Sequence, residues 1–393
     1  MSAGVTYLGK VDYRNDERVF GIKREDRFAH IYAIGKTGTG KSTLLEGMAL
    51  QDIANGNGIA LIDPLGDLAE QVVSRIPASR REDVIYLNAA DVNQPWGYNP
   101  LRRVAPQYIA LAASGFMEVF KKMWPDAWGV RMEHILRNVL MALLEQRRAT
   151  MHDILRVLTD KEYRKQIAGS VQNQPVRRFF EQEYEKFSSS YRVDASAPIQ
   201  NKIGAFLADP ALARMLTAPK QEIHIRQVMD EGKVLIANLA KGRIGEDSSS
   251  LLGGLLVTTL GLAAYTRVDT PPAERRDFFI YIDEFQSFTT LALANMLSEL
   301  RKYRVSFSVA HQFLHQLTPE IRHAVLGNVG TFISFRVGPE DASYVVREFQ
   351  SVFEQDDVIN LENYRIYLKL LIDGMPSWPF SARTLRGPIL GLS

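Results

Sequence analysis

The sequence predicts an α/β protein with a mostly parallel central sheet and an inserted all-helical domain. Short apolar runs alternate with helical patterns up to residue 87 and again from residue 233 onward, which is typical of parallel βαβ units. Between these two regions, residues 101–228 show helical periodicity only. With 46% hydrophobic and 23% charged residues, the chain has the composition of an ordinary globular protein.

The main α/β domain is predicted to consist of residues 29–100 and 229–393. Residues 1–28 are expected to form a β-hairpin that leads into it, because two strand-like runs flank a polar turn. The strands expected in the main domain are the apolar run before Gly35 and residues 58–63, 84–87, 233–238, 277–282, 305–310 and 331–336. The helices expected there are 41–54, 67–75, 251–265 and about 290–303, and residues 364–384 are expected to form a terminal hairpin.

The inserted domain, residues 101–228, carries a clear apolar stripe at 3.6-residue spacing. The stripe consists of Met132, Ile135, Leu136, Val139, Leu140, Leu143 and Leu144. The alternative interpretation is a set of crossover helices that flank the sheet. A run of this length is far longer than a normal crossover, so an inserted helical domain is favoured.

Composition and charge exclude several classes of function. The chain has no cysteine, which excludes disulfides, thiolate metal sites and a cysteine nucleophile. Its net charge is +2, so any DNA contact must be built locally and not by a global basic field. The N-terminus does not resemble a signal peptide, and the apolar run 251–265 is too short to span a bilayer. We therefore expect a cytoplasmic protein with no transmembrane segment.

A glycine-rich stretch, Gly35-Lys-Thr-Gly38-Thr-Gly40-Lys41-Ser42-Thr43, lies between a predicted strand and a predicted helix. It has the form Gly-x4-Gly-Lys-Ser of a phosphate-binding loop (P-loop), whose backbone N–H groups surround phosphate oxygens. Lys41 would add a positive charge for the β and γ phosphates, and Ser42 would supply a hydroxyl for Mg²⁺. The predicted cofactors are ATP and Mg²⁺, and the predicted cofactor-binding residues here are Gly35, Thr37, Gly38, Thr39, Gly40, Lys41, Ser42 and Thr43.

Two acidic residues, Asp283 and Glu284, end a four-residue apolar strand. Beside a phosphate loop, the first can hold Mg²⁺ and the second can deprotonate the attacking water. Gln312 follows the next strand and therefore lies at the same edge of a parallel sheet. Its amide could orient the water or bind the γ phosphate. Lys41, Glu284 and Gln312 are thus the predicted catalytic residues, with Ser42 and Asp283 as metal ligands.

Other polar residues near these motifs allow more than one role. Asp63 and Asp67 could border the site or cap a helix. His311 and His315 are poor candidates for paired metal ligands because no carboxylate lies near them at ligand spacing. The guanine-specific pattern Asn-Lys-x-Asp is missing, because Asn201-Lys202-Ile-Gly lacks the aspartate. ATP is therefore favoured over GTP.

With these motifs in place, the chain resembles the HerA/FtsK superfamily of ring-forming ATPases, and most closely the cytosolic part of type IV secretion coupling proteins. Matching stretches include Gly35–Leu45, Ile62–Asp67, Tyr98–Leu101, Ile282–Gln286, Leu300–Tyr303, Ala310–Gln312 and Asn328–Ala342. The resemblance implies a RecA-like P-loop domain, a homo-hexamer, DNA as the substrate moved and ATP hydrolysis as the energy source. It also implies that Arg301 is an arginine finger for a neighbouring subunit, with Arg304 and Arg336 as weaker candidates, and that Arg336 lies among the nucleotide-binding residues.

The resemblance leaves the biological setting open. Membrane-anchored coupling proteins begin with transmembrane helices, and none is expected here, so the protein could act in conjugation, DNA packaging, repair or defence. A secretion channel, a relaxase or a nuclease are possible partners. The alternative function is an ATP-gated ring scaffold, or a secretion ATPase for a partner protein. Basic aromatic segments such as 121–124 and 177–180 could face a channel or be solvated helix faces.

Overall fold

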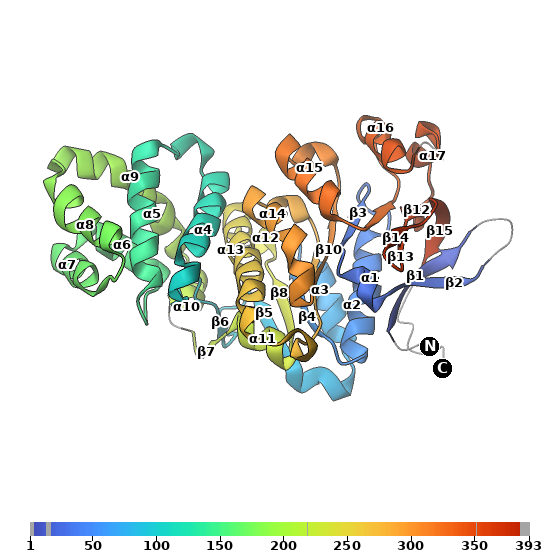
Figure 1. Ribbon diagram of the computed structural model, residues 1–393, viewed down its shortest axis with the longest axis horizontal. Coiled ribbons are helices and arrows are strands. Elements are labelled where there is room, and N and C mark those ends of the chain that lie inside the picture. Colours follow the sequence, from blue (N-terminus) through green and yellow to red (C-terminus); the bar gives the residue numbers. More distant parts are fainter. Residues whose placement is uncertain (1–3, 13–16, 218, 351, 386–393) are drawn as a thin grey trace. The chain divides into compact units, whose positions relative to one another are not determined.

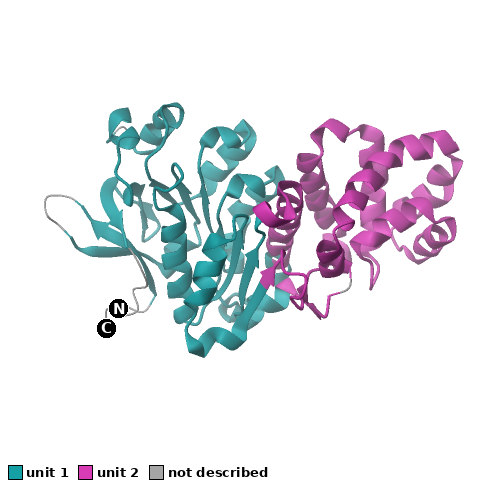
Figure 2. Ribbon diagram, turned by 180° about the vertical axis from the view of Figure 1, so that it is seen from behind, with its two compact units in different colours: residues 1–86, 226–240, 264–393 teal, residues 87–225, 241–263 magenta. Residues whose placement is uncertain are grey.

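The computed structural model describes residues 4–12, 17–217, 219–350 and 352–385. The chain divides into two compact units, shown in different colours in Figure 2. The first consists of residues 1–86, 226–240 and 264–393, and the second of residues 87–225 and 241–263. The second unit therefore includes two segments, 87–100 and 241–263, that lie outside the predicted insertion of 101–228.

The first unit is built on an 11-stranded mixed sheet (Figure 1). Its strands are ordered β2 (Val19–Lys23), β1 (Val5–Val11), β15 (Phe380–Thr384), β12 (Arg365–Lys369), β11 (Thr331–Ser334), β3 (Ile31–Ile34), β10 (Val305–His311), β9 (Phe278–Ile282), β4 (Gly58–Asp63), β8 (Val234–Asn238) and β5 (Val84–Asn88). The pairs from β11 to β8 are parallel. The α/β fold with a mostly parallel central sheet is thus confirmed.

The register of the parallel strands brings their carboxyl ends to one edge of the sheet. Ile34 at the end of β3 pairs with His311 of β10 and with Ser334 of β11. Ile282 at the end of β9 pairs with Ile62 of β4. These strands are buried along their whole length, as their near-continuous apolar sequences require. The segments that follow them in sequence therefore meet at the same edge.

Helices α2 (Lys41–Ala54) and α3 (Asp67–Ser74) contribute to the core of the first unit. Their apolar side chains form one buried cluster with alternate residues of the strands, such as Ile31 and Ala33 of β3. The other helices with residues in this unit are α1 (Arg24–Arg27), α11 (Ile225–Glu231), the end of α13 (Glu246–Thr266), α14 (Leu291–Leu300), α15 (Pro319–Asn328), α16 (Pro339–Glu348) and α17 (Gln355–Ile359). The predicted bounds of α2 are confirmed, and those of α3 are confirmed to within one residue.

The two ends of the described chain extend the sheet on one side. Strand β1 pairs antiparallel with β2 and with β15, and β15 pairs antiparallel with β12. The predicted N-terminal and C-terminal hairpins are therefore neighbours in one sheet, which the sequence alone did not indicate. A small second hairpin, β13 (Leu371–Ile372) and β14 (Met375–Pro376), interrupts the connection from β12 to β15.

The second unit is mainly helical. It contains α4 (Ile109–Met123), α5 (Val130–Leu144), α6 (Met151–Thr159), α7 (Lys161–Ser170), α8 (Gln174–Arg178), α9 (Ser189–Leu207), α10 (Pro210–Thr217) and α12 (Lys241–Ile244). The predicted apolar stripe lies on α5, and all seven of its residues are buried. A short parallel pair, β6 (Trp96–Gly97) and β7 (Gln221–Glu222), completes the unit.

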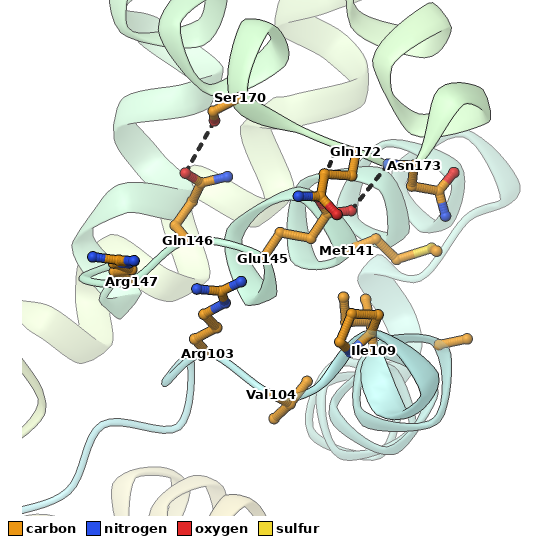
Figure 3. A pocket seen from close by; sticks show the side chains of 12 residues that line it. Arg103, Val104, Ile109, Met141, Glu145, Gln146, Arg147, Ser170, Gln172 and Asn173 are labelled. Carbon is orange, nitrogen blue, oxygen red and sulfur yellow. Dashed lines mark hydrogen bonds between the residues drawn. The ribbon is translucent and has the colours of Figure 1, made fainter.

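A cavity of about 430 Å³ lies within the helical unit (Figure 3). Two of its polar groups are fixed by hydrogen bonds. Ser170 Oγ donates to Gln146 Oε1 at 3.0 Å, and the backbone N–H of Gln172 donates to Glu145 Oε2 at 2.6 Å. The side chain of Arg103 also lines this cavity. All its lining residues belong to the second unit, and none of them is a residue of the phosphate loop.

Helix α13 (Glu246–Thr266) contains the most apolar run of the chain. Among the described residues, the segment Glu246–Asp269 is long and apolar enough to cross a membrane by length and composition, and 78% of its most apolar window is buried. The helix is longer than the apolar run 251–265 considered in the sequence, because it extends beyond these residues at both ends. Its burial agrees with the expected core helix.

Candidate active site

The phosphate loop connects β3 to α2, and its glycines occupy conformations that other residues rarely adopt. Gly38 has a φ of +76° and Gly40 a φ of +118°. A Cβ atom at Gly40 would also lie 2.9 Å from Cδ1 of Tyr364. Three backbone hydrogen bonds join the loop to other segments: Gly35 N–H donates to the His311 carbonyl at 3.3 Å, Lys36 N–H donates to the Arg336 carbonyl at 2.8 Å, and Tyr364 N–H donates to the Thr39 carbonyl at 2.7 Å.

Lys41 is the first residue of α2, and its side chain turns back over the loop. Its Nζ donates to the carbonyls of Gly35 at 2.6 Å and Lys36 at 3.1 Å. Burial lowers the pKa of Lys41, while the nearby carboxylates of Asp283 and Glu284 oppose that shift. The lysine charge therefore lies between the loop and the two acids. Thr37, Gly38 and Ser42 are exposed at the rim, whereas Thr39 is buried and Thr43 half-buried.

Ser42 and Asp283, the two predicted metal ligands, are in direct contact. Ser42 Oγ donates to Asp283 Oδ2 at 2.7 Å. Burial raises the pKa of Asp283 to about 6, and the neighbouring carboxylates of Glu284 and Asp63 add to the shift, whereas the Ser42 hydrogen bond opposes it. The negatively charged carboxylate of Asp283 therefore lies beside the hydroxyl of Ser42. Both groups offer hard oxygen atoms, which are the ligands that Mg²⁺ prefers.

The described residues contain no group of three or more His, Asp or Glu side chains that could hold a metal ion. A cation between Ser42 and Asp283 would therefore need further oxygen ligands from water or from a bound phosphate. This is the way Mg²⁺ is usually held in phosphoryl-transfer sites, where it keeps several waters and few protein ligands. The residues present therefore fit a Mg²⁺–nucleotide and do not fit an all-protein metal site.

Glu284 lies beside Asp283 with a buried carboxylate. Its backbone is in the left-handed region, with a φ of +47°, which is uncommon for a residue other than glycine. Two amides donate to the carboxylate: Gln312 Nε2 to Oε1 at 2.8 Å, and Gln286 Nε2 to Oε2 at 2.6 Å. The structure thus brings together Glu284 and Gln312, which the sequence placed at one edge of the sheet.

The nearby aspartate and histidines have structural partners. Asp63 accepts hydrogen bonds from the backbone N–H groups of Leu65 and Ala69, so it caps the start of α3, while its charge also acts on Asp283. His311 is buried against Tyr32, and burial lowers its pKa to about 3. His315 pairs instead with Asp341. The two histidines therefore do not form a joint metal site.

Arg301 and Arg336 lie at opposite edges of the sheet. Arg336 directly follows the strand-end region beside the phosphate loop, and its side chain donates to the Leu361 carbonyl and to Asn363 Oδ1. Arg301 follows α14 and precedes β10, whose first residue is six residues from His311 at the site edge. At 3.3 Å per residue this separation is about 20 Å. Arg301 is exposed and has no ion pair among the described residues.

Two residues of this site were not identified from the sequence. Gln286 follows the acidic pair by two residues in Asp283-Glu-Phe-Gln286, but only the 3-10 turn Phe285–Ser287 brings its amide back to Glu284. Tyr364 is remote in sequence, and its contact with the phosphate loop depends on the C-terminal strands joining the sheet. The local pattern of residues carries no signal for either contact.

Known structures with this fold include nucleotide-bound proteins. The bacterial conjugative coupling protein TrwB, truncated as TrwBΔN70, matches with a TM-score of 0.66 and 16% identity, over 95% of this chain and 88% of that one. TrwB in complex with ADP and Mg²⁺ matches with a TM-score of 0.66 and 16% identity, over 98% and 96% of the chains. VirB4 of Thermoanaerobacter pseudethanolicus matches with a TM-score of 0.64 and 15% identity, over 99% and 98%. No curated protein matches the chain.

A family model also matches most of the sequence. It describes the DNA-binding domain of type IV secretion-system coupling proteins, and the match covers residues 20–360. This range contains the phosphate loop, the acidic pair, Gln312 and the whole helical unit. The chain therefore belongs to the family of type IV secretion-system coupling protein DNA-binding domains.

Proposed function

We propose that the protein is an ATPase of a homo-hexameric ring that couples ATP hydrolysis to movement along DNA. The observation that supports this most strongly is the meeting of the phosphate loop with three groups suited to hydrolysis. Ser42 contacts Asp283, Glu284 follows Asp283 directly, and Gln312 donates to Glu284. A phosphate loop that only binds nucleotide needs no buried second acid held by an amide.

In this proposal the loop N–H groups and Lys41 would hold the phosphates, and Ser42 and Asp283 would hold Mg²⁺. When bound, Mg²⁺ supplies positive charge that offsets the charge developing on the phosphate oxygens. The cation would also offset the negative charge of Asp283, whose pKa is raised by burial and, to a smaller extent, by the neighbouring carboxylates. Related structures support a nucleotide with Mg²⁺: TrwB has been solved with ADP and Mg²⁺, with an ATP analogue and with a GTP analogue.

In the proposed hydrolysis step, Glu284 is the general base. Its carboxylate accepts a proton from water while the water oxygen attacks the γ phosphorus and the bond from that phosphorus to ADP breaks. Gln312, at the end of the adjacent strand, orients the water or the γ phosphate. Lys41 stabilises the charge that builds up on the phosphate oxygens. The balanced products are ADP and inorganic phosphate, with the proton on Glu284.

The proposal that the protein moves DNA is supported by its family, the DNA-binding domains of type IV secretion-system coupling proteins. The net charge of +2 gives no independent support. The second candidate is an ATP-gated scaffold or a secretion ATPase for a partner protein, which the structural likeness to VirB4 allows. We place the protein in the cytoplasm, with recruitment to a membrane by a partner as part of the same proposal.

The first test is the rate of phosphate release by variants of the site. Glu284→Gln keeps the shape of the side chain but cannot accept a proton, so it should bind ATP and lose roughly 10²-fold or more in turnover. Lys41→Ala should lose both binding and turnover. The matched control is Glu299→Gln, which removes one charge from an exposed pair with Lys302. Wild-type turnover by Glu284→Gln would exclude Glu284 as the base.

A further inference from the structure

The Glu284 carboxylate is held from two sides by amides that come from different parts of the chain. Gln312 extends from the end of β10, and Gln286 lies on the 3-10 turn that follows Glu284 itself. Each amide donates to a different carboxylate oxygen, at 2.8 Å and 2.6 Å. Because Glu284 is only 7% exposed, these amides take the place of the water that would otherwise solvate its carboxylate.

The two amides are not equivalent. Gln312 lies at the strand-end edge, level with the start of the phosphate loop, where its amide can also serve the γ phosphate or the water. Gln286 is joined to the acid through one intervening residue, so it remains beside Glu284 whichever partner Gln312 has. The left-handed backbone of Glu284, with a φ of +47°, starts the turn that returns the Gln286 amide to the carboxylate.

We propose that Gln286 is a positioning residue that holds the Glu284 carboxylate in the orientation in which it accepts the proton of the attacking water. This inference rests on the proposed function of Glu284. Because Gln286 Nε2 donates directly to Glu284 Oε2, its effect on hydrolysis would pass through Glu284. An uncharged donor suits this role, because it orients the carboxylate without neutralising its charge as a lysine or arginine would.

The test compares variants of this turn in the 393-residue chain. Gln286→Met keeps the length of the side chain and removes the N–H donor, and Gln286→Glu keeps its shape and replaces the donor with an acceptor. Ser287→Ala, in the same turn, is the matched control. Gln286→Met should lower kcat by about tenfold, equivalent to one hydrogen bond to a charged group, and leave KM for ATP unchanged. Gln286→Glu should lose more, and Ser287→Ala nothing.

Two further measurements separate positioning from a general structural role. Calorimetry should give the same Kd of ADP with Mg²⁺ for Gln286→Met as for the wild type, but about tenfold weaker binding of ADP with Mg²⁺ and aluminium fluoride, a mimic of the transferring phosphate. In addition, Gln286→Met should cause no further loss in a Glu284→Gln background, because a residue that acts only through Glu284 has nothing left to orient.

The outcomes distinguish a failure of the proposed function from a failure of the inference about Gln286. A wild-type protein that releases no phosphate from ATP overturns the proposed function, and this inference with it. A wild type that turns over while Gln286→Met keeps its kcat and its affinity for the aluminium fluoride complex overturns the inference alone. Losses from Gln286→Met and Glu284→Gln that multiply, or an equal loss of ADP affinity, also overturn it, because either result assigns Gln286 a role apart from the base.

Discussion

Arg27 and Asp52 form a fully buried ion pair next to the phosphate-loop helix. Arg27 Nη1 and Nη2 donate to the two oxygens of Asp52 at 2.7 and 2.8 Å, and Nη2 also donates to Tyr281 Oη at 2.7 Å. Burial alone would lower the pKa of Arg27, but Asp52 and Tyr281 outweigh burial and raise it. The pair therefore joins the end of α2 to β9, the strand that leads to Asp283.

Asp52→Ala should lower the free energy of unfolding by about 3–5 kcal/mol, because it leaves the Arg27 charge buried without its partner. Denaturant unfolding followed by circular dichroism checks this. The control is Glu299→Ala, which breaks an exposed pair with Lys302 and should cost less than about 1 kcal/mol. The double variant Arg27→Met with Asp52→Leu should regain most of the loss. Equal stability of Asp52→Ala and Glu299→Ala would show that this pair does not hold the helix.

At the scale of single elements, the bounds of helices and strands could be predicted where they depend on local sequence. Helix α2 begins at Lys41, directly after Gly40, and ends at Ala54 before the break at Asn55 and Gly56, as the sequence indicated. Strand β4 likewise has the predicted bounds. The pairing of β1 with β15 was not predictable, because a hydrophobic pattern indicates a strand and its buried face but not a partner that lies far away in sequence.

In the candidate site, too, some contacts could be predicted from the sequence and others could not. The approach of Asp283 and Gln312 to the phosphate loop could be predicted, because parallel strands present their carboxyl ends at one edge. The contact between Gln286 and Glu284 could not, since it depends on one left-handed residue and the turn after it. The burial of His311 against Tyr32 was equally invisible, because a strand pattern does not reveal which side chain fills the space beside a histidine.

Helix α14 carries the chain from the acidic pair to the opposite edge of the sheet, where Arg301 is exposed. About 20 Å separates that edge from the phosphate loop of the same chain, so we propose that Arg301 acts at the phosphate loop of a neighbouring subunit. Mixing inactive Lys41→Ala with inactive Arg301→Ala should therefore restore part of the ATPase activity. Some interfaces of the mixed ring then combine an intact Lys41 with an intact Arg301, where an arginine finger can contribute about 10³-fold in rate.

The control for this mixing experiment is Lys41→Ala with Glu284→Gln. Both changes damage the same half of the site, so no mixed interface contains a complete set and activity should stay low. Native mass spectrometry verifies that subunits have exchanged before rates are measured. Verified mixed rings of Lys41→Ala and Arg301→Ala that remain as inactive as either parent would remove the support for a finger in trans.

For the whole molecule, the candidate site lies in one of the two units. The first unit contains every residue of the candidate site, whereas the second contains the cavity of about 430 Å³ and most of the helices that follow residue 87. The family match covers both units. A translocating ATPase must convert nucleotide turnover into movement of DNA, whereas a scaffold needs only binding or turnover. Movement of DNA is therefore the property that separates the two candidate functions.

Displacement of streptavidin from the end of biotinylated DNA measures that movement directly. With ATP and Mg²⁺, the wild-type protein should release streptavidin from a single-stranded or a double-stranded oligonucleotide, and Glu284→Gln should bind the DNA without releasing it. Binding should weaken as salt is added, because the cations of the salt compete with the protein for the DNA phosphates. Release of streptavidin only when ATP is hydrolysed would support movement along DNA. ATP hydrolysis by the wild type with no release from either kind of DNA would contradict it.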